Sequence, residues 1–153
     1  MAFIDSIKKR AKQNKKTIVL PETADMRTLE AAHKILQEGI ADIILVGDKQ
    51  TIIKKADGLD LTGATFVDPY DCDKLNDYVS ILVELRKKKG MTPEEAKELL
   101  LTNVLYFGCI MVKAGDADGM VAGAVNSSAN VLRAALQILK TAPDTKLVSA
   151  FFL

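Results

Sequence analysis

Short apolar runs alternate along the chain with longer segments whose apolar residues recur every three or four positions. The runs at 17–20, 42–47 and 64–68 have the length of strands, and the unbroken run at 42–47 is typical of a strand buried on both faces. Helical spacing between the runs predicts helices over 26–38 and 50–56. Strands and helices that alternate with short connections indicate a parallel sheet with helices on both faces.

The second half of the chain is predicted to contain more helix than strand. In "TPEE", Thr92 is the expected N-cap, Pro93 the first helical residue and Glu95 the partner that closes a capping box. The other elements expected in this half are helices over 72–89, 104–115 and 130–140, and strands over 119–124 and 146–153. We therefore expect a three-layer α/β/α fold with a mostly parallel sheet.

The basic run "IKKRAKQNKK" near the start has the pattern of an amphipathic helix. Its apolar neighbours Phe3, Ile4, Ile7 and Ala11 fall at helical spacing, which leaves the lysines and arginine on the solvent side. The whole chain carries 21 Lys and Arg residues against 20 Asp and Glu residues, for a net charge of +1. This balance argues against a nucleic-acid-binding protein, which normally has a large basic excess.

Other features point to a cytoplasmic protein without a metal site. No segment approaches the ~18 consecutive apolar residues of a membrane span. Charges at Asp5 and from Lys8 onward interrupt what would be the apolar region of a signal peptide. Cys72 and Cys109 lie far apart without a CxxC motif, so we expect neither a zinc site nor a disulfide framework.

The last residues, "KLVSAFFL", form an apolar run with no polar tail. Termini usually lie at the surface, so this ending is unusual for a complete protein. We expect residues 1–153 to be the N-terminal α/β domain of a longer, two-domain protein. Residues 145–153 would then begin the crossing into the second domain.

In parallel α/β sheets, ligands bind where the strands end and the loops enter the next helices. The stretch "VAGAVNSSANVLRAAL", at 121–136, runs from a predicted strand through a small polar loop into a helix. Free N–H groups at a helix start favour an anion, and a guanidinium that reaches back over them adds a planar fork for phosphate or carboxylate. The candidate anion-binding residues are Gly123, Asn126, Ser127, Ser128 and Arg133.

A second interpretation of this stretch is equally open from spacing alone. Ser128 or Asn130 would merely cap the helix, and Arg133 would pair with a surface acid. The loop is not a Walker loop, because GxxxxGK[ST] is absent, and the chain has no GxGxxG motif either. In the loop at 20–27, Arg27 also lies near a helix start.

Four stretches resemble the phosphate acetyltransferase (phosphate acetyl/butyryltransferase) family. They are "TIVLPETADMRTLEAA", "EGIADIILVGD", "ELRKKKGMTPEEA" with "YFGCIMVKAGDADGMVAGAVNSSANVLRAALQILKTAP", and "KLVSAFFL". The resemblance implies reversible transfer of an acetyl group between acetyl-CoA and inorganic phosphate, which gives acetyl phosphate. It also implies two α/β domains around an active-site cleft, a homodimer, no permanently bound cofactor, and a fold similar to that of the isocitrate and isopropylmalate dehydrogenases.

By motif, the resemblance assigns roles to particular residues. Arg133 matches a family arginine of the active-site cleft, and Ser127 and Ser128 match its small hydroxyl pair, so Arg133 and Ser128 are the expected catalytic residues. Arg86 matches an arginine proposed to bind coenzyme A, and Arg27 an arginine at the edge of the cleft.

The residues that handle the coenzyme A thiol in this family lie beyond the equivalent of Leu153. The general base is therefore not identified in this chain, and residues 1–153 are expected to be inactive alone. The sequence departs from the family pattern at Ala134, where proline is usual, and at Asp144, where glycine is usual. Two alternatives stay open, namely a phosphate butyryltransferase and a non-catalytic, acyl-CoA-sensing regulatory domain.

Overall fold

The computed structural model describes residues 3–148. Four parallel strands form one sheet in the order β3-β2-β1-β4. The strands are Thr17–Leu20 (β1), Asp42–Val46 (β2), Thr65–Val67 (β3) and Gly119–Met120 (β4). The α-helices are Phe3–Gln13 (α1), Met26–Glu38 (α2), Lys49–Lys55 (α3), Leu75–Arg86 (α4), Pro93–Thr102 (α5), Val104–Ala114 (α6) and Ser128–Ile138 (α7), and 3₁₀ turns lie at Pro69–Asp71 (η1) and Lys87–Lys89 (η2).

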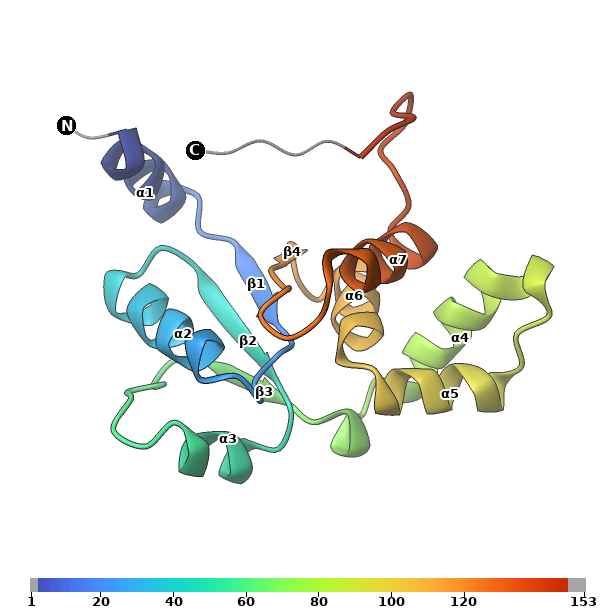
Figure 1. The fold of residues 1–153 in the computed structure, drawn as a ribbon, viewed down its shortest axis with the longest axis horizontal. Helices are drawn as coiled ribbons and strands as arrows, with labels where there is room; N and C mark the ends of the chain where they lie inside the picture. The colour runs from blue at the N-terminus through green and yellow to red at the C-terminus, as the bar shows by residue number, and fades with distance from the viewer. Residues whose placement is uncertain (1–2, 149–153) are drawn as a thin grey trace.

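Helices cover both faces of the sheet (Figure 1). Successive side chains of a strand point to opposite faces. Val19 and Val46 therefore pack into the core shared with α4, α5, α6 and α7. Leu20 and Leu45 pack into a second core with α2 and α3. The predicted three-layer α/β fold with a parallel sheet is confirmed.

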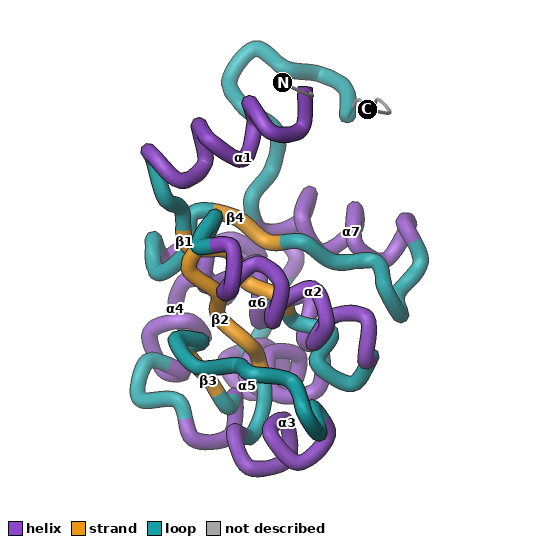
Figure 2. The backbone as a smooth tube through the Cα atoms, turned by 90° about the vertical axis from the view of Figure 1, so that its left-hand side faces the viewer, coloured by secondary structure: helices purple, strands orange, loops and turns teal. Residues whose placement is uncertain are grey.

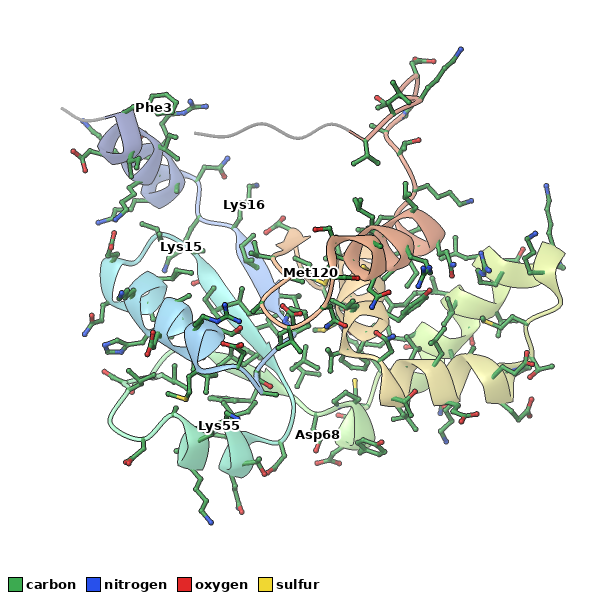
Figure 3. The ribbon with its side chains drawn as sticks, in the orientation of Figure 1. Phe3, Lys15, Lys16, Lys55, Asp68 and Met120 are labelled. Atoms are coloured by element: carbon green, nitrogen blue, oxygen red, sulfur yellow. The ribbon has the colours of Figure 1, made fainter. Side chains whose placement is uncertain are left out.

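α6 is the most deeply buried helix of the described chain, with every residue from Leu105 to Met111 buried. It lies close to the sheet because residue 108 is glycine. A Cβ atom at Gly108 would lie 2.6 Å from Sδ of Met120 and 3.4 Å from Cγ1 of Val19. Met120 belongs to β4 (Figure 3), and its side chain accordingly lies against this helix.

The predicted start of α5 is confirmed in detail. The Thr92 hydroxyl accepts a hydrogen bond from the Glu95 backbone N–H at 3.2 Å, and the Glu95 carboxylate accepts one from the Thr92 N–H at 2.9 Å. Pro93 is the first helical residue. The capping box satisfies two N–H groups that the helix itself leaves without a partner.

The amphipathic helix predicted near the start is α1. None of its described residues is buried, and Phe3 and Ile4 are 65% and 60% exposed. The helix lies apart from both helical layers (Figures 1 and 2), and Lys8 pairs with Glu38 of α2 at 2.7 Å. Across residues 3–148, no helix combines the length and the apolar character that a bilayer crossing requires.

Several predicted boundaries are wrong. The helix expected over 72–89 begins only at Leu75, because η1 and a turn precede it, and its last residues form η2. The helix expected over 130–140 spans Ser128–Ile138. The strand expected over 146–153 is not formed by residues 146–148, which are loop, and its remaining residues lie outside the described part of the chain.

The strand expected over 119–124 is reduced to Gly119–Met120. The reason is a competing set of hydrogen bonds. The backbone N–H groups of residues 123–126 all donate to the side chain of Glu22, so they cannot take part in a ladder with a neighbouring strand. This arrangement forms the centre of the candidate site.

Candidate functional site

Two loops lie side by side at the carboxyl edge of the sheet. β1 and β4 are paired in parallel, with Ile18 opposite Gly119 and Val19 opposite Met120. The loop after β1 leads into α2, and the loop after β4 leads into α7. Because parallel strands end at the same edge, residues about 100 positions apart in the sequence meet there, and this edge is where α/β proteins bind ligands.

The Glu22 carboxylate is enclosed by the β4–α7 loop. Its Oε2 accepts hydrogen bonds from the backbone N–H groups of Gly123 and Ala124, both at 2.7 Å. Its Oε1 accepts from the N–H groups of Val125 at 3.1 Å and Asn126 at 2.8 Å, and from Nδ2 of Asn126 at 2.9 Å. Such a run of converging amides is a typical anion-binding concavity, and here it surrounds a carboxylate of the protein itself.

The backbone conformation of the loop favours this arrangement, and its hydrogen bonds offset the cost of burying the Glu22 charge. Gly123 has a φ of +113°, a region that glycine adopts without the steric cost of a side chain. Glu22 is only 4% exposed. Burial alone would raise the pKa of Glu22, but the hydrogen bonds from the loop outweigh it and lower the pKa from 4.5 to about 2. Glu22 is therefore ionised at neutral pH.

Arg27 connects the same two loops. Its guanidinium donates to the Asp25 carboxylate at 2.8 and 3.0 Å, and its Nη2 also donates to the carbonyl oxygen of Ala124 at 2.6 Å. The hydrogen bonds from Arg27 lower the pKa of Asp25 to about 2. Asp25 is also the N-cap of α2. Arg27, whose side chain is 71% exposed, thus lies at the rim of the loop pair.

The N-cap of α7 is not one of the two residues considered from the sequence. Ser127 is the N-cap, and its hydroxyl accepts from the N–H of Asn130 at 3.3 Å. Neither Ser128 nor Asn130, the caps considered from the sequence, has this role, and Ser128 is the exposed first residue of the helix. Arg133 reaches back by one turn and donates from Nη1 to Oδ1 of Asn130 at 3.0 Å.

The positive charges of Arg86 and Arg133 both act on Tyr106. The Tyr106 hydroxyl on α6 donates to Oε1 of Gln137 on α7 at 2.9 Å. Burial raises the pKa of Tyr106, while the positive charges of both arginines act on it in the opposite direction. Nε of Arg86 is buried and has no hydrogen-bond partner among residues 3–148.

The predicted site residues thus fall into two neighbouring groups. Gly123 and Asn126 contact Glu22, and Arg27 joins the same loop. Ser127 and Ser128 begin α7, whose next turn carries Arg133. Arg86 and Arg133 both act electrostatically on Tyr106, whereas Arg27 contacts Asp25 and Ala124. The ligand-binding roles of all of these residues remain predictions.

Glu22, Tyr106 and Gln137 were missed by the sequence analysis. The only local signal for Glu22 is an acidic residue directly after the strand and Pro21, a position that turn residues also occupy. Tyr106 lies in an apolar run that indicates core. Their partners are distant in sequence, so spacing could not reveal them.

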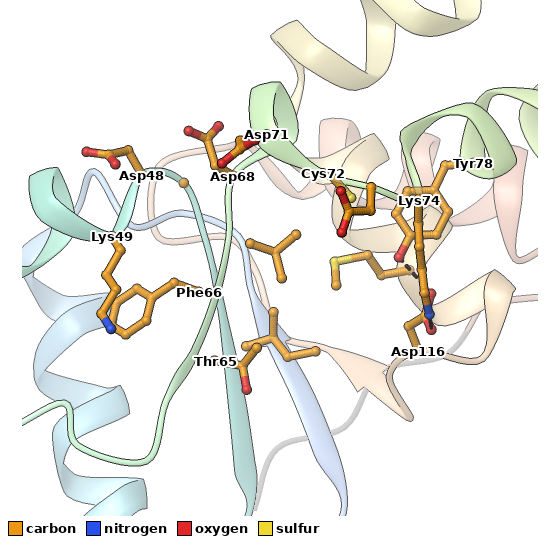
Figure 4. Close-up of a pocket in the computed structure, with 15 residues that line it drawn as sticks. Asp48, Lys49, Thr65, Phe66, Asp68, Asp71, Cys72, Lys74, Tyr78 and Asp116 are labelled. Atoms are coloured by element: carbon orange, nitrogen blue, oxygen red, sulfur yellow. Dashed lines mark hydrogen bonds and ion pairs between the residues drawn. The ribbon is translucent and has the colours of Figure 1, made fainter.

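A cavity of about 240 Å³ lies beside the loop pair, and Glu22, Arg27, Val121 and Ala124 are among its lining residues. A larger cavity of about 530 Å³ lies away from the predicted site residues, next to β3 and the start of α4 (Figure 4). There Asp116 accepts from the Tyr78 hydroxyl at 2.6 Å and pairs with Lys74. Within residues 3–148, no three His, Cys, Asp or Glu side chains are placed to bind a metal ion.

The fold and these loops define an α/β protein whose candidate site lies at the carboxyl edge of a parallel sheet, and comparison with known proteins specifies the family. A family model described as "Phosphate acetyl/butaryl transferase" matches residues 2–153. The chain therefore belongs to the phosphate acetyl/butyryltransferase family, as its sequence motifs predict. The likeness to the isocitrate and isopropylmalate dehydrogenase fold stays a prediction.

Named relatives and solved structures agree with this assignment. A phosphate acetyltransferase of Acetivibrio thermocellus is 55% identical over 99% of this chain, and one of Thermoanaerobacterium thermosaccharolyticum is 52% identical over 100% of it. A phosphotransacetylase from Streptococcus pyogenes matches 96% of the chain and 46% of its own length with a TM-score of 0.87 and 33% identity. The EutD phosphotransacetylase from Staphylococcus aureus matches 94% of the chain and 44% of its own length, with a TM-score of 0.84 and 36% identity. The chain spans 46% of the length of each of the two curated relatives.

Proposed function

We propose that the chain forms one half of a phosphate acetyltransferase, which transfers an acetyl group reversibly between acetyl-CoA and inorganic phosphate. Relatives that are 55% and 52% identical to it carry that name. Because the chain spans less than half of their length, turnover is proposed to require residues outside 1–153. The general base is one of the groups that this proposal assigns to the missing half.

The reaction needs a cation beside phosphate. A phosphate oxygen attacks the carbonyl carbon of the thioester, the new C–O bond forms, the C–S bond breaks, and the coenzyme A sulfur leaves and is protonated. An arginine fork suits both inorganic phosphate and the acetyl phosphate product, and donors near the carbonyl stabilise its developing negative charge. The observation that carries the proposal is Arg133, which reaches back by one turn toward the start of α7, where Ser128 lies exposed.

The other arginines take supporting roles in this proposal. Arg86 binds the phosphate groups of coenzyme A, and Arg27 lies at the edge of the cleft. Nε of Arg86 is buried and has no hydrogen-bond partner within residues 3–148, which supports a role beyond surface solubility. Coenzyme A acts here as a substrate, with no permanently bound cofactor. A cytoplasmic homodimer is part of the same proposal.

The test is phosphate-dependent thiol release from acetyl-CoA, measured for the natural protein and for residues 1–153 alone. We expect turnover by the natural protein and none by the 153-residue chain. Turnover by the short chain would contradict the half-site proposal. A preference for butyryl-CoA over acetyl-CoA would favour phosphate butyryltransferase. Binding of acetyl-CoA without turnover by the natural protein would favour an acyl-CoA-sensing domain.

A further inference from the structure

We propose that Glu22 is a positioning residue for the reaction, which acts by fixing the β4–α7 loop and, through it, the start of α7. This inference rests on the proposed function, since it assigns the residues beyond the loop to the active site. No direct contact of Glu22 with substrate is involved. Its carboxylate occupies the concavity of backbone N–H groups in which other proteins bind a free anion.

Both oxygens of the Glu22 carboxylate are hydrogen-bonded by the β4–α7 loop. Five N–H donors, four from consecutive backbone amides and one from the Asn126 side chain, converge on the two oxygens of one buried carboxylate. All four backbone N–H groups point at this carboxylate, so this loop conformation depends on an acceptor at its centre. Glu22 comes from the loop after the neighbouring strand β1, and only the buried Pro21 separates it from the last residue of that strand.

The loop that Glu22 holds leads directly into the predicted site. Asn126, which donates twice to Glu22, is followed directly by Ser127, the N-cap of α7. Ser128 is the next residue, and Arg133 reaches back toward this turn through Asn130. A shift of the loop therefore moves the first turn of α7, together with the hydroxyl and guanidinium that the proposal uses.

Five N–H donors require a carboxylate at position 22, and an amide cannot accept all of their hydrogen bonds. A glutamine at position 22 would present one oxygen and one NH₂ group to five donors. At least two backbone N–H groups would then face another donor, and the loop would have to rearrange. An aspartate would keep the charge but place it one methylene further away. The expected order of function is therefore Glu, then Asp, then Gln.

The kinetic test uses the natural protein with Glu22→Gln, Glu22→Asp and the matched control Glu30→Gln, an exposed glutamate of α2. Misplacement of active-site groups by a fraction of an ångström to 1 Å lowers rates by up to about a hundredfold. We expect Glu22→Gln to lower kcat/KM for phosphate by about tenfold to a hundredfold, with Glu22→Asp between it and the wild type. Glu30→Gln should leave the kinetics unchanged. Unchanged kinetics in folded Glu22→Gln would overturn the inference.

A double-mutant cycle separates positioning from general destabilisation. If Glu22 acts through the start of α7, the combined loss in Glu22→Gln/Arg133→Ala should be smaller than the product of the two single losses. Independent effects would multiply, and that result would overturn the inference. Loss of folding in both Glu22→Gln and Glu22→Asp would also overturn it, in favour of a purely structural role.

Amide hydrogen exchange tests the loop without reference to turnover. In the wild type, the N–H groups of Gly123, Ala124 and Asn126 should be protected. Glu22→Gln should speed their exchange by roughly tenfold or more while α6 stays unchanged. If the natural protein proves inactive, the proposed function fails, yet this measurement still decides whether Glu22 fixes the loop. Equal protection in both variants would overturn the inference.

Discussion

Oε1 of Glu22 accepts two hydrogen bonds from one residue, Asn126, through its backbone N–H at 2.8 Å and its side-chain Nδ2 at 2.9 Å. The two residues are 104 positions apart and follow neighbouring parallel strands. This pair fixes the loop between the end of β4 and the N-cap of α7, Ser127, which follows Asn126 directly. It joins the loop that leads into α2, which carries Arg27, to the loop that leads into α7, which carries Arg133.

Glu22 should make the protein sensitive to acid. Its pKa is 4.5 when unfolded and about 2 when folded, so its contribution is fully present above pH 4.5 and is lost as the pH falls toward 2. The shift corresponds to about 3 kcal/mol of unfolding free energy at neutral pH. Urea unfolding at several pH values should therefore show a shallower loss between pH 4.5 and 2 for Glu22→Gln than for the wild type. Equal slopes would show that the loop does not stabilise the carboxylate.

Gly123 should not tolerate a side chain, although there is room for one. A Cβ atom at this position meets nothing within 4 Å, so the cost of Gly123→Ala comes from the φ of +113° alone. We expect a loss of about 1–2 kcal/mol in unfolding free energy. Gly119→Ala on β4 is the matched control, because its φ is ordinary and its Cβ would make a normal contact of 3.5 Å with Ile18. Equal stability of the two variants would contradict a constrained loop.

The capping box of α5 gives a prediction independent of the site. Thr92→Ala removes the hydroxyl that accepts the Glu95 N–H, and we expect a loss of about 1 kcal/mol. Thr102→Ala serves as the control, because that hydroxyl only donates to the Glu98 carbonyl within the last turn. Chemical denaturation should show little change for Thr102→Ala. A cost for the control as large as for Thr92→Ala would contradict the assigned cap.

Tyr106→Phe tests the contact between α6 and α7. The ring stays in place while the hydrogen bond to Gln137 is lost, which should cost about 1 kcal/mol of unfolding free energy. Tyr70→Phe is the control, since Tyr70 is 72% exposed. Thermal unfolding of both variants measures the difference. A neutral Tyr106→Phe would mean that the hydrogen bond to Gln137 does not stabilise the contact between α6 and α7.

Local patterns were enough to predict much of the fold. The strand at 17–20, the helix at 26–38 and the capping box at Thr92 depend on nearby residues, and all are confirmed. The strand predicted over 42–47 is also present and ends one residue earlier, at Val46. The predicted strand over 119–124 failed because its amides bind a side chain about 100 residues earlier in the chain. Periodicity contains no information about such a partner.

The site was predictable only in part, because local patterns reveal its residues but not their distant partners. The stretch from Gly123 to Arg133 was singled out because glycine, amide, hydroxyl and guanidinium groups follow one strand. That its amides enclose Glu22, and that the charges of Arg86 and Arg133 both act on Tyr106, depends on how β1 and β4 pair and how α4, α6 and α7 pack. These contacts arise only in the folded chain.

The most direct test of the account is the phosphate dependence of acetyl transfer by the natural protein with Arg133→Ala. Arg133 is exposed, so the variant should fold and unfold like the wild type. We expect kcat/KM for phosphate to fall by about a hundredfold, while Lys113→Ala, an exposed cation on α6, behaves as the wild type. Wild-type kinetics in folded Arg133→Ala would contradict the account and remove the start of α7 from the active site.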